Sequence, residues 1–156
     1  MDLVSPAFVD QQPIPVKHAN RGVRGGVNIS IPLQWNGTPA ATESLALSIV
    51  DRHPIARSWV HWLVIDIPTT VNALSEGASQ SRMPAGAKEL KNSFGTLGYG
   101  GPQPPPGSGA HDYEITLYAL NVKELALKPD ATLAQFTAVL EGKIIARASL
   151  VGRFER

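Results

Sequence analysis

Alternation of apolar and polar positions predicts the β-strands of this chain, because successive side chains of a strand point to opposite faces of its sheet. In the segment from Ser44 to Val50, the alternation places Leu45, Leu47 and Ile49 on one face. The segment from Val60 to Ile67 is apolar on both faces, with His61, Leu63, Ile65 and Ile67 on one face and Val60, Trp62 and Val64 on the other. We therefore expect this second segment to lie in the interior of a sheet.

Three further segments have strand character: Tyr113 to Leu120, Ile144 to Phe154 and, as a shorter candidate, Val27 to Ser30. A peripheral helix is predicted between Thr132 and Glu141, where Leu133, Phe136, Val139 and Leu140 recur at helical spacing. Asp130 or Thr132 can cap its start, and Gly142 can end it. The pattern indicates an all-β sandwich with one or two short peripheral helices, formed by a single domain over residues 1–156.

Glycine and proline strengthen this assignment. The chain has 14 Gly and 13 Pro, together well above the roughly 12% of an average protein. Such a composition excludes a helical bundle and favours short strands joined by long turns. Many of these residues lie between Ile67 and His111, in a stretch with little strand periodicity that includes FGTLGYGGPQPPPGSGAH. Loops of that length within a compact domain are usually functional.

Charge and cysteine content narrow the classes of function. With 14 Lys+Arg against 13 Asp+Glu the net charge is +1, so a nucleic-acid partner is not expected. No apolar run approaches the roughly 18 residues of a membrane span. The absence of cysteine excludes disulfides, a thiol nucleophile and thiolate metal sites. The first residues, MDLVSPAFVDQQPIP, do not resemble a secretory signal, so we expect a cytoplasmic protein. The sequence leaves its oligomeric state open, a homodimer included.

Histidines are the first candidates for chemistry. His53, His61 and His111 fall at strand ends or beside the long loop. Period-two geometry places Asp51 and His53 on one face, and His111 and Tyr113 on another, so both segments could supply polar groups to one cavity. The alternative for His61 is a buried core histidine with an ordinary hydrogen-bond partner. His18 lies in a polar segment and is expected to be exposed.

Three familiar chemistries fit these residues poorly. His53, His61 and His111 with Asp51 have donor types that zinc accepts, but their spacing matches no short ligand motif, so we expect no metal and no cofactor. A Ser-His-Asp hydrolase is not marked either, because there is no GxSxG elbow and neither Ser58 nor Ser108 has a distinguishing context. The Gly-rich run from Gly98 to Gly109 lacks the GxxxxGKS pattern of a nucleotide-phosphate loop.

The order of four motifs is more specific than any one of them. VNISIPLQW with NGTP, then DRHPIARSWVHWLVIDI, then FGTLGYGGPQPPPGSGAHDYEITLYAL, and finally GKIIARASLVGRFER together resemble the phosphatidylethanolamine-binding protein family. The short single-domain chain resembles its bacterial Raf-kinase-inhibitor-like branch in particular. The resemblance runs from about Ser5 to the C-terminus, and the family pattern GPxPPxGxxxHxY stands in order at Gly101 to Tyr113. It implies a Greek-key sandwich of two antiparallel sheets.

The resemblance also implies a small anion pocket near one end of the sandwich. Carried over residue by residue, the pocket consists of Asp51, His61, His111 and Tyr113, with Trp59 as a wall. The rim would come from the proline-glycine loop, which contains Pro104, Pro105, Pro106 and Gly107. A histidine beside a carboxylate is more readily protonated, so an imidazolium and the tyrosyl hydroxyl could together hold a phosphate group. On this mechanism, affinity should fall above about pH 7.

Two motifs depart from the family pattern. The family's DPDxP is DRHPI here, with His53 at the position of the second acid, and the family's HRY is His111, Asp112 and Tyr113. The signs of the two altered positions are exchanged. One hypothesis is that a contact between the two motifs is retained with reversed polarity, Asp112 accepting from His53 or Arg52. The other is that two loop residues drifted independently, since Asp112 points away from the face of His111 and Tyr113.

Three functions from different classes remain. The first is a regulatory binding protein, not an enzyme, whose pocket takes a small anion or a phosphorylated head group. The second is an inhibitor of a protein kinase or protease that docks through the Pro/Gly loop. The third is a hydrolase of small esters or phosphoesters that uses His61 and His111 as acid and base.

Overall fold

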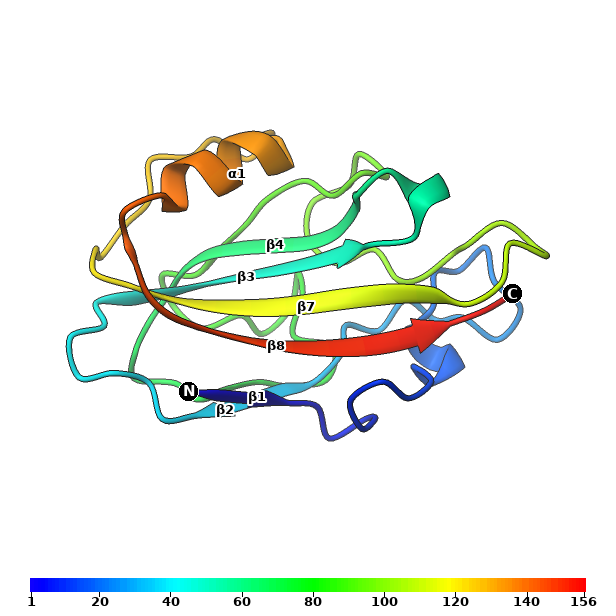
Figure 1. Cartoon of the computed structure of the whole chain (residues 1–156), viewed down its shortest axis with the longest axis horizontal. Helices are drawn as coiled ribbons and strands as arrows, with labels where there is room; N and C mark the ends of the chain where they lie inside the picture. The colour runs from blue at the N-terminus through cyan, green and yellow to red at the C-terminus, as the bar shows by residue number, and fades with distance from the viewer.

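Two antiparallel β-sheets form the body of the protein, whose computed structural model describes all residues from 1 to 156 (Figure 1). The larger sheet has the strand order β6-β4-β3-β7-β8, and the smaller has the order β1-β2-β5. The strands are β1 (Asp2–Val4), β2 (Leu33–Asn36), β3 (Ser44–Asp51), β4 (Trp59–Ile67), β5 (Ala73–Leu74), β6 (Lys88–Glu89), β7 (His111–Leu120) and β8 (Ile144–Phe154). In the larger sheet β7 returns past β6 and β4 to pair with β3, which is the Greek-key order.

The main hydrophobic core lies between the two sheets. Leu3, Leu33 and Trp35 of the smaller sheet pack there against alternate residues of the larger one, including Leu47 and Ile49. β3 pairs with β4 on one side and β7 on the other, and all eight of its residues are buried. This confirms the predicted two-sheet sandwich.

A single α-helix, α1 (Leu133–Leu140), covers the other face of the larger sheet (Figure 1). Phe136 and Leu140 bury their side chains in a second core with Leu63 and Ile65 of β4. Thr132 accepts a hydrogen bond from the Gln135 amide, and the Gln135 side chain accepts one from the Thr132 amide, so the helix begins with a capping box. The predicted peripheral helix is confirmed. No helix of the structure has both the length and the apolar character needed to cross a membrane.

The prediction of a short strand at Val27 to Ser30 is wrong. These residues form no strand, because Asn28 has a φ of +61° and its side chain binds the long loop. The second strand of the sandwich lies further along the chain at β2, where buried Leu33 and Trp35 alternate with exposed Gln34 and Asn36. The predicted strands at 44–50, 60–67, 113–120 and 144–154 are all present, with small shifts at their ends.

Two irregularities in β4 change which side chains share a face. Its register against β3 shifts between the pairs Leu45–Ile67 and Leu47–Val64, and again between Ile49–Trp62 and Val50–Val60. The first shift surrounds Asp66, whose φ is +57°, and it brings Ile67 into the core between the sheets. The second shift surrounds His61. Strict alternation therefore fails at both positions, and His61 and Ile67 do not share the face of Leu63 and Ile65.

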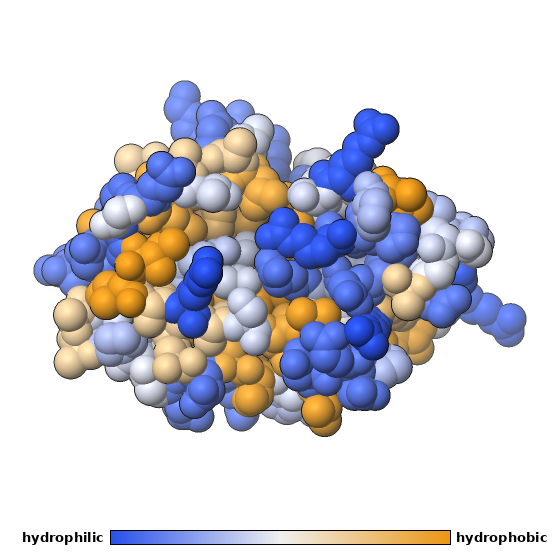
Figure 2. Space-filling view, viewed as in Figure 1, coloured by the Kyte–Doolittle hydropathy of each residue, from blue (hydrophilic) through white to orange (hydrophobic).

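The N-terminal segment covers part of the exposed edge of β8. Gln11 and Ile14 donate backbone hydrogen bonds to Val151 and Arg153, and Arg153 donates one back to Gln12. Ile144 and Ile145, at the other end of β8, are 42% and 39% exposed. On the face of the molecule where β8 lies in front, apolar residues are scattered among many hydrophilic ones (Figure 2).

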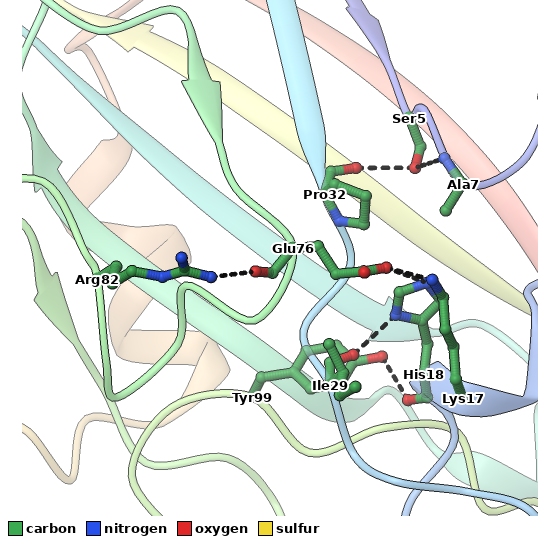
Figure 3. A network of polar contacts seen from close by, with 9 residues as sticks. All are labelled: Ser5, Ala7, Lys17, His18, Ile29, Pro32, Glu76, Arg82 and Tyr99. Atoms are coloured by element: carbon green, nitrogen blue, oxygen red, sulfur yellow. Dashed lines mark hydrogen bonds and ion pairs between the residues drawn. The ribbon is translucent and has the colours of Figure 1, made fainter.

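His18 is fully buried, so the expectation of an exposed histidine was wrong. Figure 3 shows its ring between the carbonyl of Ile29, 2.8 Å from Nδ1, and the carboxylate of Glu76, 3.7 Å from Nε2. Lys17 binds the same carboxylate at 2.6 Å, and the Tyr99 hydroxyl donates to the His18 carbonyl. Burial lowers the pKa of His18. The polar segment around His18 therefore belongs to the folded interior, where it contacts the long loop.

Candidate functional site

Neighbouring strands of the larger sheet place the candidate residues at one end of the sandwich. Asp51, the last residue of β3, lies opposite Trp59 of β4 on one side and Tyr113 of β7 on the other. Residues opposite one another on adjacent strands project to the same face, so these three side chains form a row. His111 begins β7, two residues before Tyr113, and therefore projects to that face as well.

A cavity of about 730 Å³ opens at this row. Asp51, His61, His111 and Tyr113 all line it, as the sequence predicted, although His61 and His111 lie on different strands. Trp59 and Pro105 also line the cavity, whereas Gly107 does not. The Gly107 amide binds the carbonyl of Arg156 instead, which fixes the outer part of the Pro/Gly loop to the end of the chain.

His61 is held at the second irregularity of β4 and is only 2% exposed. Its Nδ1 lies 2.6 Å from the carbonyl oxygen of Gly100, so the ring donates its proton to the long loop. The edges of Tyr113 and Phe94 pack against it, with ring centroids 5.0 and 5.7 Å away. Burial lowers the pKa of His61 from its ordinary 6.5 to about 4, against the opposing effects of the Gly100 carbonyl and Asp51. His61 is therefore neutral at pH 6 to 8, so we do not expect it to supply an imidazolium to an anion.

Asp51 and His111 form a buried pair. His111 Nδ1 lies 2.6 Å from Asp51 Oδ2, and the two residues are 1% and 3% exposed. The other carboxylate oxygen, Oδ1, accepts the backbone amide of His53 at 2.8 Å. The ring of His53 stacks on that of His111, with centroids 3.9 Å apart. Both oxygens of the carboxylate are thus occupied, which reduces its repulsion of an anion in the cavity.

Tyr113 contributes a hydroxyl with no partner in the protein. The residue is 1% exposed and packs with the core between the sheets, yet its hydroxyl makes no hydrogen bond. Burial raises the pKa of this hydroxyl strongly, and the nearby Asp51 carboxylate raises it further. Tyr113 therefore stays protonated and can donate a hydrogen bond to a ligand. An unsatisfied buried hydroxyl is rare enough to indicate a site where a ligand or ordered water binds.

The proposed contact between the two altered motifs is absent. Asp112 accepts from Arg153 Nε at 3.0 Å, its direct neighbour across β7 and β8, and not from His53 or Arg52. Arg52 pairs with Glu114 at 2.7 Å. The side chain of His53 accepts the Ile55 amide at the turn Pro54–Ala56, and its ring rests on His111. Between Arg52 or His53 and Asp112, the one hydrogen bond runs from the backbone amide of Arg52 to the backbone carbonyl of Asp112.

Arg57 is a lining residue that the sequence did not single out. It follows the turn Pro54–Ala56 with a φ of +49°, and its side chain is exposed and makes no hydrogen bond or ion pair within the chain. It places an unpaired cation at a cavity that also contains the Tyr113 hydroxyl. No periodicity or motif marks Arg57, because its position depends on a left-handed backbone conformation that the sequence does not reveal.

Ser108 was considered as a nucleophile from the sequence and set aside, but the structure gives it a partner. Its Oγ lies 2.9 Å from His111 Nε2, which gives it the context that the sequence pattern lacked. The same oxygen lies 2.7 Å from the carbonyl of Pro105. By contrast, the histidines and carboxylates do not gather into a metal site, and no group of three such side chains is placed to hold an ion.

Comparison with known proteins places this geometry in a family. The family model described as phosphatidylethanolamine-binding protein matches residues 4–155. The chain belongs to the phosphatidylethanolamine-binding protein family. The UPF0098 protein of Methanothermobacter thermautotrophicus is 38% identical over 100% of this chain and 99% of its own length. The UPF0098 protein YbhB of Escherichia coli is 30% identical over 99% of both chains.

Solved structures share the fold of this family member. The crystal structure of YbcL from Escherichia coli, described as a new member of the mammalian family, superposes with a TM-score of 0.92 and 29% identity. It covers 99% of this chain and 98% of its own. A homologue from Chlamydia trachomatis gives a TM-score of 0.85 at 34% identity, with 99% and 97% coverage. The resemblance seen in the sequence is therefore confirmed over the whole chain.

Proposed function

We propose that this phosphatidylethanolamine-binding protein family member binds a small phosphate-type anion or a phosphorylated head group in the cavity beside Asp51, and that binding serves a regulatory role. The observation that carries the proposal is the buried, unpartnered hydroxyl of Tyr113, a residue lining a cavity that the exposed Arg57 also lines. A hydrogen-bond donor and a cation are both favourable partners for an anionic oxygen. No activated group is needed for binding, so the proposal does not require catalysis.

The neutral state of His61 narrows the class of anion that the cavity can bind. Because its Nδ1 donates to Gly100, its Nε2 presents a lone pair and accepts rather than donates a hydrogen bond. A phosphate group with one protonated oxygen can donate to this nitrogen while its other oxygens accept from Tyr113 and Arg57. The apolar walls, Ile55, Trp59 and Phe94, leave room for a short organic substituent. A phosphate monoester such as phosphoethanolamine combines these features.

The test is titration with inorganic phosphate and with phosphoethanolamine by isothermal calorimetry. Tyr113→Phe removes one donor and Arg57→Gln removes the cation, and each should weaken binding by about 10-fold or more. Arg24→Gln is the matched control, since Arg24 is exposed, makes no side-chain hydrogen bond or ion pair and does not line the cavity. Phosphate and phosphoethanolamine binding equally well would indicate a site for the anion alone.

Two results would contradict the proposal. The first is the absence of saturable binding of either probe by the folded protein. The second is equal affinity in Arg57→Gln, Tyr113→Phe and Arg24→Gln, which would place any bound anion elsewhere on the surface.

The inhibitor function and the cellular location stay predictions from the sequence. Pro105, Pro106 and Gly107 are exposed, and Pro105 also lines the cavity, so a protein docked on the loop would sense an occupied cavity. Inhibition assays against purified kinases and proteases test this function. A relative from Mycobacterium tuberculosis, 37% identical over 99% of this chain, is described as a putative lipoprotein, so fractionation of cells is needed to test the cytoplasmic prediction.

A further inference from the structure

A serine, a histidine and a carboxylate stand in line beside the cavity. Ser108 Oγ lies 2.9 Å from His111 Nε2, and His111 Nδ1 lies 2.6 Å from Asp51 Oδ2. Asp51 ends β3 and His111 begins the adjacent strand β7, while Ser108 precedes His111 by three residues on the Pro/Gly loop. This is the arrangement of a nucleophile, a general base and an orienting carboxylate, recognised by geometry rather than by sequence order.

The imidazole of His111 is fixed in the orientation that a general base requires. Asp51 is held in turn by the His53 amide on Oδ1, and the His53 ring covers one face of His111 at 3.9 Å. Because Nδ1 faces the carboxylate, Nε2 is the ring nitrogen that faces Ser108. The serine hydroxyl has one proton and two acceptors within reach, so it donates either to this nitrogen or to the Pro105 carbonyl.

The loop also presents Ser108 for attack. Gly107 and Gly109 have φ values of +77° and +82°, so the serine sits on a sharp turn between two left-handed residues, and it is partly exposed. A Cβ at either glycine would meet nothing within 4 Å, so the backbone conformation and not crowding calls for glycine there. The amides of Gly109 and Ala110 donate to no acceptor in the chain. Free amides just after a nucleophile are the donors that stabilise a developing oxyanion.

We propose that Ser108, His111 and Asp51 form a catalytic unit that hydrolyses short-chain carboxylic esters. Ser108 Oγ bonds to the ester carbonyl carbon while its proton passes to His111 Nε2. The carbon–oxygen bond to the alcohol then breaks, and the alcohol leaves with that proton. Water next attacks the acyl-serine, giving its proton to His111, and the carboxylic acid departs as Ser108 regains a proton. No oxidant, metal or cofactor is required.

This activity goes beyond anion binding and uses a different set of atoms. The hydrolase considered from the sequence paired His61 with His111, but His61 donates its Nδ1 proton to Gly100 and has no nucleophile beside it. Ser108 does not line the cavity, whereas Tyr113 and Arg57 do. Binding of phosphate and attack by Ser108 can therefore succeed or fail separately.

The experiment treats the folded protein with a fluorophosphonate probe and locates the label by mass spectrometry. The serine oxygen bonds to phosphorus, fluoride leaves, and the serine proton passes to His111. We expect one label, on Ser108, and none in Ser108→Ala. His111→Gln and Asp51→Asn should slow labelling about 100-fold or more. Ser81→Ala, at an exposed serine without a histidine partner, should label at the wild-type rate.

Hydrolysis of p-nitrophenyl acetate supplies the second measurement. A burst of one p-nitrophenol per chain, lost in Ser108→Ala, would report the acyl-serine. The proposal is overturned if folded wild-type protein labels at Ser108 no faster than the heat-denatured chain does, or if His111→Gln, folded by circular dichroism, labels at the wild-type rate. Phosphate affinity is measured in parallel for Ser108→Ala and should equal that of the wild type. A failure of labelling would therefore overturn the catalytic proposal without affecting the test of anion binding.

Discussion

Burial affects the protonation of His61 more strongly than the nearby carboxylate of Asp51 does. An imidazole beside Asp51 gains from the negative charge, but the enclosed ring loses more by giving up water, so the neutral form prevails. The cation available to an anion in the cavity is the guanidinium of Arg57. The Nε2 atom of His61 can accept a hydrogen bond from a ligand, while its Nδ1 atom joins β4 to the long loop through Gly100.

Acid should destabilise the protein through His61. Its pKa is lowered to about 4 in the folded state, so the unfolded chain binds one more proton between about pH 6.5 and 4. The stabilisation is present above pH 6.5 and is lost as the pH falls toward 4, by about 3 kcal/mol. Buried His18, whose pKa is also lowered, contributes in the same direction.

Urea unfolding at a series of pH values measures this loss. His61→Gln retains an N–H for Gly100 but no titrating group, so its free energy of unfolding should depend less steeply on pH over this range. An unchanged slope in His61→Gln would show that folding does not lower the pKa of His61.

At the scale of single elements, the irregularity around Asp66 in β4 determines which face Ile67 joins. Asp66 is 7% exposed and has a φ of +57°, which Asp and Asn tolerate better than other residues with a Cβ. Its Oδ1 accepts the buried amide of Leu125, and its Oδ2 lies 2.9 Å from Lys88 of β6. One side chain therefore joins β4, its neighbour β6 and the segment leading to α1.

Asp66→Ala should destabilise the fold by about 2 to 4 kcal/mol, since it leaves the Leu125 amide unpaired and keeps a strained backbone. Asp66→Asn retains the acceptor for Leu125 and the tolerance for positive φ, and should lose much less. Thermal unfolding compares the two variants. Equal losses would mean that the charge facing Lys88, and not the buried amide, supports this part of β4.

The elements show how far periodicity can predict this fold. β3 and most of β8 follow the apolar pattern of the sequence because every second side chain, such as Leu45, Leu47 and Ile49, packs in the core between the sheets. β4 does so only in part, since a residue inserted at a bulge moves every later side chain to the opposite face. Asn28 ended a predicted strand for a similar reason, because its left-handed backbone and its bond to Gly101 depend on a loop more than 70 positions away.

The candidate site was predictable where it rests on strand ends and not where it rests on loops. Asp51, His61, His111 and Tyr113 converge because adjacent strands end together. Arg57 and Ser108 join them through positive-φ turns, at Arg57 itself and at Gly107 and Gly109, whose shape no alternation encodes. The Asp112–Arg153 pair could be predicted only from the register between β7 and β8, which the sequence does not specify.

Across the whole molecule, the N-terminal segment supports the site through the long loop. The Asn28 side chain accepts the Gly101 amide and donates to the Tyr99 carbonyl, and the Asn20 amide donates to the Pro102 carbonyl. Gly100, between these contacts, receives the Nδ1 proton of His61. The His18 network in Figure 3 lies beneath this junction, where the hydroxyl of Tyr99 reaches the His18 carbonyl.

Gly101→Ala should disturb this junction. A Cβ at Gly101 would lie 2.0 Å from the His18 carbonyl oxygen, so one of the two segments must move. We expect a loss of about 1 to 3 kcal/mol of stability. We also expect weaker binding of phosphoethanolamine, because a shift of Gly100 would move His61, which donates to its carbonyl. Gly107→Ala is the comparison, since its Cβ meets nothing and only its positive φ is strained. Chemical denaturation and calorimetry of both variants measure the difference, and equal binding in the two would show that the junction does not position His61.

The complete burial of β3 has a consequence for the time scales on which parts of the site move. Amide protons in a strand paired on both sides and covered on both faces exchange with solvent only when the whole protein unfolds. Asp51, at the end of that strand, therefore belongs to the slowest-exchanging unit of the molecule, whereas the free amides of Gly109 and Ala110 are open to solvent in the native state. The carboxylate of Asp51 is thus held by the most stable part of the fold, whereas the two amides after Ser108 exchange without unfolding.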